Sequence, residues 1–87
     1  MYIILVYDVG EKRIAKALKM CRKYLTWVQN SVFEGEITKA TFEKLKYELG
    51  QIINKDEDSV IIYILRTTKY SQRECLGKEK NPIDIFI

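Results

Sequence analysis

The sequence predicts an α+β fold, with strands and helices in the order β-α-β-β-α-β followed by one further strand. Two apolar runs rich in Ile, Val and Tyr, residues 2–9 and 59–66, are too short for helices and have the composition of central strands. Two longer segments, residues 11–25 and 39–53, repeat apolar residues at helical spacing. A length of 87 residues allows one domain, which we expect to span residues 1–87.

The first strand and the first helix meet at Gly10. The strand, Tyr2–Val9, is an apolar run that this glycine ends. One face of the helix over residues 11–25 is formed by apolar residues at helical spacing: Ile14, Leu18, Cys21 and Leu25. Cys21 lies on that face, so we expect it to be a buried thiol rather than half of a disulfide.

The middle of the chain is expected to form a hairpin and a second helix. Residues 27–37 carry aromatic and β-branched residues broken by Asn30 and Ser31, which predicts two short strands joined by a tight turn. Thr38 is the expected N-cap of the second helix. A charged turn at 54–58 precedes the strand at 59–66. The polar residues 67–81 are expected to be a loop, and Pro82 opens a last strand at 83–87. This order is the ferredoxin-like arrangement, an antiparallel sheet with both helices on one face.

The two central strands predict a homodimer. A strand with one solvated face alternates apolar and polar side chains, but residues 2–7 and 60–65 are apolar throughout. Two helices can cover only one face of the sheet, so the other face would expose a large apolar patch. A two-fold dimer packed sheet to sheet would bury this patch. The last segment, residues 82–87, would dock on the partner's sheet or pair within its own chain.

Basic residues are concentrated in the first helix. The net charge is +3, but residues 11–24 hold six basic residues and one acidic residue, a net +5. The remaining nine basic and eleven acidic residues give −2. Lys12, Lys16, Lys19 and Lys23 recur opposite the apolar face. Such a stripe is typical of a surface that binds nucleic-acid phosphates, and a solvated helix face can have the same pattern.

Asp8 is the main candidate for chemistry. It ends an apolar strand and shares a face with Tyr2, Ile4 and Val6, the face assigned to the dimer contact. A buried carboxylate needs a partner, a proton or a cation. A two-fold axis would bring two Asp8 side chains together, and two carboxylates with water could hold a magnesium ion. The alternative is that Asp8 caps the following helix or lies at a solvated strand end.

Composition excludes several other classes of site. The chain has no histidine, which rules out His-based triads, imidazole general bases and His–metal sites. No glycine-rich phosphate loop or dinucleotide fingerprint is present. No apolar run reaches the ~18 residues of a membrane span, and the start lacks the basic region of a signal peptide. We therefore expect a cytoplasmic protein without membrane contact.

Several short motifs together resemble the CRISPR-associated Cas-two family, and the resemblance covers essentially the whole chain. They are Tyr7-Asp8-Val9, Arg13 in the first helix, Val28-Gln29-Asn30-Ser31-Val32-Phe33-Glu34-Gly35, and Asp58-Ser59-Val60 before the fourth strand. The resemblance implies a ferredoxin-like homodimer with terminal strands exchanged or packed across it. It also implies that Asp8 is the metal-site aspartate, that Arg13 is a nucleic-acid contact, and that Tyr7, Ser31 and Phe33 are supporting residues.

The resemblance implies a role in CRISPR adaptation, the acquisition of new spacers. Members are described as magnesium-dependent endonucleases that act on single-stranded RNA or double-stranded DNA. We expect one magnesium ion at the dimer interface, with Asp8 as the catalytic and metal-binding residue. The alternative is a non-catalytic scaffold that bridges duplex DNA for the Cas-one integrase. A toxin-like ribonuclease or a small-molecule regulatory domain on the same fold is a third possibility.

Overall fold

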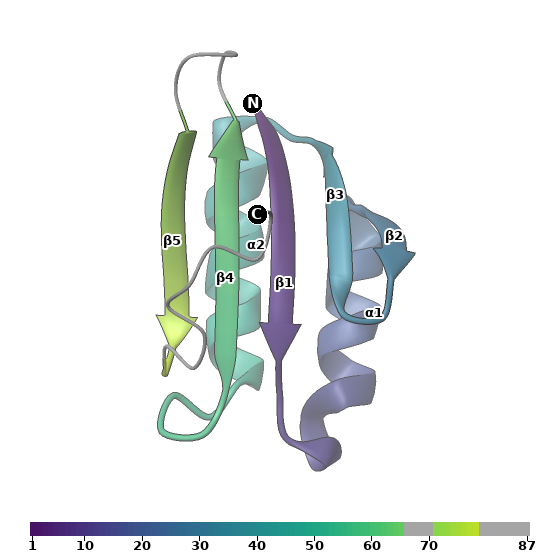
Figure 1. The fold of residues 1–87 in the computed structure, drawn as a ribbon, viewed down its shortest axis with the longest axis vertical. Helices are drawn as coiled ribbons and strands as arrows, with labels where there is room; N and C mark the ends of the chain where they lie inside the picture. Colours follow the sequence, from purple (N-terminus) through teal and green to yellow (C-terminus); the bar gives the residue numbers. More distant parts are fainter. Residues whose placement is uncertain (66–70, 79–87) are drawn as a thin grey trace.

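The computed structural model describes residues 1–65 and 71–78 as a five-stranded antiparallel sheet with helices packed against it (Figure 1). The elements follow the predicted order: β1 (Tyr2–Asp8), a 3₁₀ turn η1 (Glu11–Arg13), α1 (Ile14–Tyr24), β2 (Thr26–Gln29), β3 (Val32–Glu36), α2 (Lys39–Ile52), β4 (Ser59–Leu65) and β5 (Ser71–Gly77). The strand order is β2-β3-β1-β4-β5. The predicted α+β arrangement is therefore confirmed.

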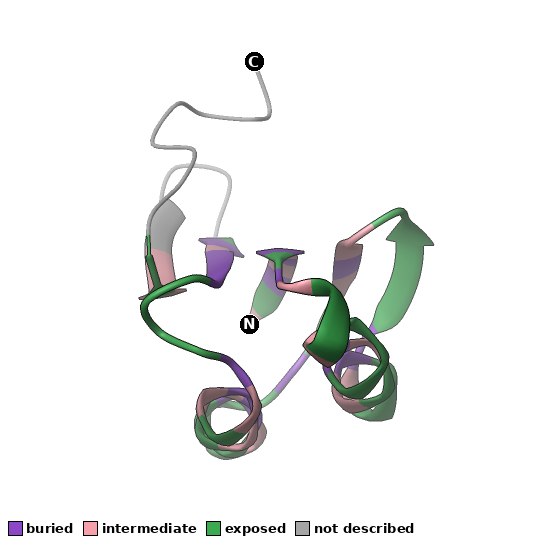
Figure 2. Cartoon of the chain, turned by 90° about the horizontal axis from the view of Figure 1, so that it is seen from below, coloured by how far each residue is buried: buried purple, intermediate pink, exposed green. Residues whose placement is uncertain are grey.

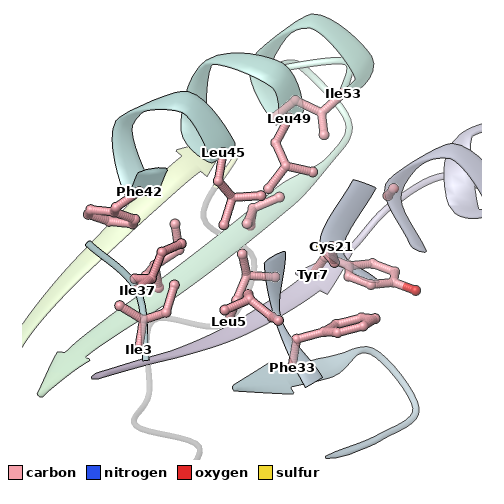
Figure 3. Packing of buried hydrophobic residues seen from close by; sticks show 14 of the residues in the cluster. Ile3, Leu5, Tyr7, Cys21, Phe33, Ile37, Phe42, Leu45, Leu49 and Ile53 are labelled. Carbon is pink, nitrogen blue, oxygen red and sulfur yellow. The ribbon is translucent and has the colours of Figure 1, made fainter. Parts of the chain in front are cut away.

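Both helices lie on the same face of the sheet, as Figure 2 shows in a view along the strands. The core fills the space between the two layers. Side chains of β1 and β3 point into it, among them Ile3, Leu5 and Phe33 (Figure 3). From the helices, Cys21, Leu45 and Leu49 pack against them, which buries Cys21 as predicted. Burial raises the pKa of the Cys21 thiol to about 12, so it behaves as an apolar core residue.

The opposite face of the sheet carries the other half of the apolar residues. On β1 these are Tyr2, Ile4 and Val6, which pair with Leu65, Tyr63 and Ile61 on β4. No helix among residues 1–65 and 71–78 covers this face. Tyr2 and Leu65 are 36% and 37% exposed, whereas Ile61 is buried. We call this surface the open face.

The first helix differs from the prediction at its start. Residues 11–13 form the 3₁₀ turn η1, and the α-helix begins only at Ile14. Ile14, predicted on the buried face, is 41% exposed because it lies in the first turn, beyond the part of α1 that packs on the sheet. Ala17 and Cys21 make the buried contacts of α1.

The hairpin and the second helix begin where the sequence predicts. The turn between β2 and β3 contains Asn30 at φ 44°, a left-handed conformation that asparagine tolerates better than most residues. Thr38 caps α2, with its side-chain oxygen accepting a hydrogen bond from the Thr41 backbone N–H at 3.1 Å. None of the helices in the described part of the chain is long and apolar enough to cross a membrane.

The prediction of a loop over residues 67–81 is wrong for its central part. β5, Ser71–Gly77, pairs with β4 along its full length, from Leu65 opposite Ser71 to Ser59 opposite Gly77. Its polar sequence fits a strand at the border of a sheet, where charged side chains discourage further pairing. The segment 83–87, predicted as the last strand, lies outside the described residues.

Gly77→Ala is expected to destabilise the fold by about 1–3 kcal/mol. Gly77 has φ +90°, and a Cβ atom there would lie 2.2 Å from the Asp58 carbonyl oxygen. Gly50→Ala is the matched control, because Gly50 lies in α2 and a Cβ atom there would meet nothing within 4 Å. Alanine at 50 should stabilise the helix by about 0.5–1 kcal/mol. Urea denaturation measures both, and equal effects at the two glycines would contradict this account.

Candidate functional site

Asp8 ends β1 on the open face of the sheet. Because side chains alternate along a strand, it shares that face with Tyr2, Ile4 and Val6, as the sequence predicts. Asp8 is an exposed residue. The end of β1 therefore presents a negative charge beside an apolar surface.

The neighbours of Asp8 come from both sides of β1. On one side, the Tyr7 backbone N–H donates a hydrogen bond to the Ser31 carbonyl oxygen, 3.1 Å away, in the turn between β2 and β3. On the other side, Asp8 pairs with Ser59, the first residue of β4. Ser59 is buried, and its Oγ lies 3.8 Å from the Cys75 Sγ. The structure thus brings Ser31 close to the end of β1 that carries Asp8.

Tyr7 and Phe33, the other expected supporting residues, point away from the open face. Their rings stack in the core, with centroids 6.2 Å apart and planes 25° from parallel (Figure 3). Burial raises the pKa of the Tyr7 hydroxyl. These two residues fix the end of β1 from the helix side, while Asp8 projects from the other side.

The four lysines lie on the outer surface of the helical layer. Lys12, Lys16, Lys19 and Lys23 are exposed, whereas Ala17 and Cys21 face the sheet. The sheet therefore separates most of this lysine stripe from the open face and from Asp8. Lys12 is the exception, since it belongs to η1, four residues after Asp8. At the other end, the Lys23 Nζ lies 3.4 Å from a Glu48 carboxylate oxygen on α2.

Arg13 is bound to two carboxylates rather than directed to the lysine stripe. Its Nε donates to the Asp58 Oδ2 at 2.6 Å, and its Nη2 donates to the Asp58 Oδ1 and the Glu57 Oε2, both at 2.9 Å. Asp58 is completely buried, whereas the Glu57 side chain is 65% exposed. The ion pair with Asp58 is the buried part of this network.

Asp58 joins three segments of the chain. Besides Arg13, its carboxylate accepts hydrogen bonds from the backbone N–H groups of Gly10 at 2.8 Å and Asn54 at 2.7 Å. Its own carbonyl accepts from the Lys78 N–H at the end of β5. We call Arg13, Asp58 and the Gly10 N–H the clamp. In the sequence, Asp58 was marked only as the last residue of the charged turn 54–58 and by the Asp58-Ser59-Val60 motif of the family resemblance.

The clamp makes stability depend on pH. Hydrogen bonds from Arg13, then those from Asn54 and Gly10, hold the pKa of Asp58 well below its usual range and outweigh the opposite effect of burial. An unfolded aspartate titrates near pH ~3.9. The contribution of ionised Asp58 to the free energy of unfolding should be complete above about pH 5 and should decline as the pH falls below about 4.

Denaturation at several pH values tests this linkage. The unfolding free energy of the wild type should fall more steeply between about pH 5 and pH 2 than that of Asp58→Asn, which lacks the titrating group. Parallel profiles for the two proteins would contradict it.

An open hollow of about 350 Å³ lies beside the clamp, lined by Gly10, Glu11, Lys12, Arg13 and Glu57. Its charges are mixed. Among the described residues, no group of three or more Cys, Asp or Glu side chains could hold a metal ion. The Asp8 carboxylate is a hard oxygen ligand of the kind that suits magnesium.

Comparison with known proteins gives one consistent result. Residues 1–73 match the model of the family described as CRISPR associated protein Cas2. A protein of Dictyoglomus turgidum named CRISPR-associated endoribonuclease Cas2 is 65% identical over 81 residues, which cover 93% of each chain. A protein of Pyrococcus furiosus with the same name is 56% identical over 87 residues and 100% of both chains.

A solved structure described as a crystal structure of cas2 superposes with a TM-score of 0.74 at 40% identity. The match covers 100% of this chain and 98% of the other. The sequence comparisons and the structural comparison thus point to the same family. The residues that match the family model include Asp8 at the end of β1. The chain therefore belongs to the Cas2 family, the Cas-two family that its sequence resembles.

Proposed function

We propose that this protein is a magnesium-dependent endoribonuclease of a CRISPR system, and that Asp8 carries its chemistry. The observation that carries the proposal is the position of Asp8, an exposed residue at the end of β1 on a sheet face that no described helix covers. Relatives at 65% and 56% identity are named CRISPR-associated endoribonuclease Cas2, which supports the same reaction class.

The active form in this proposal is a two-fold homodimer packed through the open face. That face presents partly exposed apolar side chains in the single chain, with Tyr2 and Leu65 the most exposed. A two-fold axis through it would bring the two Asp8 carboxylates toward each other. The second carboxylate would supply a further oxygen ligand for the ion. Light scattering at micromolar concentration tests the dimer, and a monomeric mass would contradict it.

Magnesium fits the donor that the chain offers, because a carboxylate oxygen is the kind of ligand the ion prefers. When bound, it would supply positive charge against the phosphodiester and make a water molecule more acidic. Asp8 from each chain would hold the ion. Because the chain has no histidine, no imidazole is available to take the proton of the attacking water. Tyr7 and Phe33 would keep the end of β1 rigid from the core side.

Cleavage of a labelled single-stranded RNA during a magnesium titration tests the reaction. We expect cleavage that EDTA stops and added magnesium restores, with duplex DNA run in parallel as the second substrate. If the dimeric wild-type protein cleaves neither substrate at any magnesium concentration, the proposed activity is wrong.

A second candidate function is a scaffold that bridges duplex DNA for the Cas-one integrase. One observation favours it: the lysine stripe lies on the outer surface of α1, with the sheet between most of it and Asp8. A phosphate-binding surface remote from the candidate catalytic carboxylate suits a protein that holds DNA. The two functions can coexist, and Asp8→Ala separates them, since the scaffold predicts that spacer acquisition survives this change.

Lys16→Gln combined with Lys19→Gln is expected to weaken the salt dependence of nucleic-acid binding. With duplex DNA, each lost phosphate contact reduces the magnitude of the slope of log K against log salt by about 0.9, so the pair should reduce it by about 1.8. The control pair is Lys39→Gln with Lys44→Gln, which removes the same charge from exposed positions of α2. Fluorescence anisotropy at several salt concentrations measures the slopes. Equal losses in the two pairs would show that net charge, not this surface, determines binding.

A further inference from the structure

We propose that Arg13 is a positioning residue that holds Asp8 in place through Asp58 and Gly10, and not a residue that contacts nucleic acid. The inference rests on the proposed role of Asp8. Resemblance alone assigned Arg13 to the nucleic-acid surface together with the lysines. Its contacts support a different role.

Three of the five N–H donors of the Arg13 guanidinium are used inside the chain. Nε and Nη2 make three hydrogen bonds to carboxylates, two of them to the buried Asp58 at 2.6 and 2.9 Å. Turning the guanidinium toward a phosphate would leave a buried carboxylate without its charged partner, which is costly. Lys12, the neighbouring basic residue, is exposed and free of this constraint.

Asp58, held by Arg13, contacts or adjoins the backbone on two sides of Asp8. Its carboxylate binds the N–H of Gly10, two residues after Asp8 in the chain. Its chain neighbour Ser59 is the strand partner of Asp8 on β4. The clamp therefore fixes both the backbone that leaves Asp8 and the strand that Asp8 pairs with.

Gly10 fits this arrangement because the clamp leaves no space for a side chain. A Cβ atom at Gly10 would lie 2.5 Å from the Arg13 Nη2 and 3.3 Å from its Cζ. Gly10→Ala would thus displace the guanidinium while every charged residue stays in the chain. This gives a second variant, independent of any change at Arg13.

The test compares Arg13→Lys and Gly10→Ala with Lys12→Gln. Three properties are measured: kcat and KM on single-stranded RNA, the salt dependence of RNA binding in the Asp8→Asn background, and hydrogen exchange of the backbone amide at position 10. Arg13→Lys keeps the charge but loses the fork that binds Asp58. We expect it to lower kcat about 10–100-fold, the range for residues that orient a metal ligand, and to leave KM unchanged.

Both clamp variants should leave the salt slope unchanged and speed hydrogen exchange of the backbone amide at position 10, relative to the intrinsic rate of the residue there. Lys12→Gln should differ on both readouts, reducing the magnitude of the slope by about 0.7 and leaving exchange of the amide at position 10 unchanged. Leu45→Ala, a core variant remote from the clamp in sequence, controls for stability. Below its unfolding transition, its kcat should equal that of the wild type.

The inference is overturned if Arg13→Lys keeps the wild-type kcat and Gly10 exchange, or if Arg13→Gln lowers the salt slope as Lys12→Gln does. If the wild type cleaves no RNA, the proposed function fails. In that case the exchange and binding measurements still decide the role of Arg13.

Discussion

Asp58→Asn is expected to lower the free energy of unfolding by about 3–5 kcal/mol, the loss typical when one partner of a buried ion pair is removed. The two carboxylate oxygens accept four hydrogen bonds, all from N–H groups. An amide replaces one oxygen by an NH₂ group that faces these donors, and it leaves the Arg13 charge without its buried partner. Urea denaturation followed by circular dichroism measures the change.

Glu57→Gln is the matched control for this prediction. It neutralises the other carboxylate bound to Arg13, but the Glu57 side chain is 65% exposed. Exposed ion pairs contribute little, so the loss should stay below about 1 kcal/mol. If both variants lose the same stability, the buried hydrogen bonds of Asp58 are not the source of the effect.

Asp8→Asn is expected to reduce RNA cleavage by about 10³-fold or more, which corresponds to ~4 kcal/mol of transition-state stabilisation. The amide has the shape of the carboxylate but lacks the negative charge that would hold a divalent cation. Because Asp8 is exposed, the fold should tolerate the change. Single-turnover cleavage of labelled RNA measures the rate, and light scattering tests whether the dimer persists.

Asp56→Asn is the control for Asp8, since it removes the same charge from an exposed position in the turn before β4. It should leave cleavage unchanged. Wild-type cleavage by Asp8→Asn with its dimer intact would reject the proposed chemistry and favour the scaffold.

Much of the fold could be predicted because the pattern of apolar residues within a short segment determines whether that segment forms a buried strand or a helix. The apolar runs that became β1 and β4 could only be central strands, and the alternation along β1 correctly put Asp8 on the face of Tyr2, Ile4 and Val6. Thr38 has the chemistry of a helix cap and takes that role. In each case a short stretch of sequence contains the whole physical signal.

The parts that could not be predicted depend on contacts between distant segments. The polar segment of β5 forms a strand because it pairs with the edge of β4. The sequence of the segment itself does not show this pairing. The pairing of Arg13 with Asp58 spans 45 positions, so the sequence showed only a basic residue among lysines. For the same reason, the sequence could not show that the sheet lies between most of the lysine stripe and Asp8. That separation follows only from the packing of α1 on the sheet (Figure 2).

Cleavage by mixed dimers tests the central claim, that two Asp8 carboxylates from two chains form one site. Wild-type and Asp8→Asn chains are refolded together in equal amounts, and RNA cleavage is compared with that of the wild type alone at the same total concentration. A shared site leaves only the dimers of two wild-type chains active, so about one quarter of the activity should remain. A residual activity of about one half would show that each chain acts by itself, and would contradict the account.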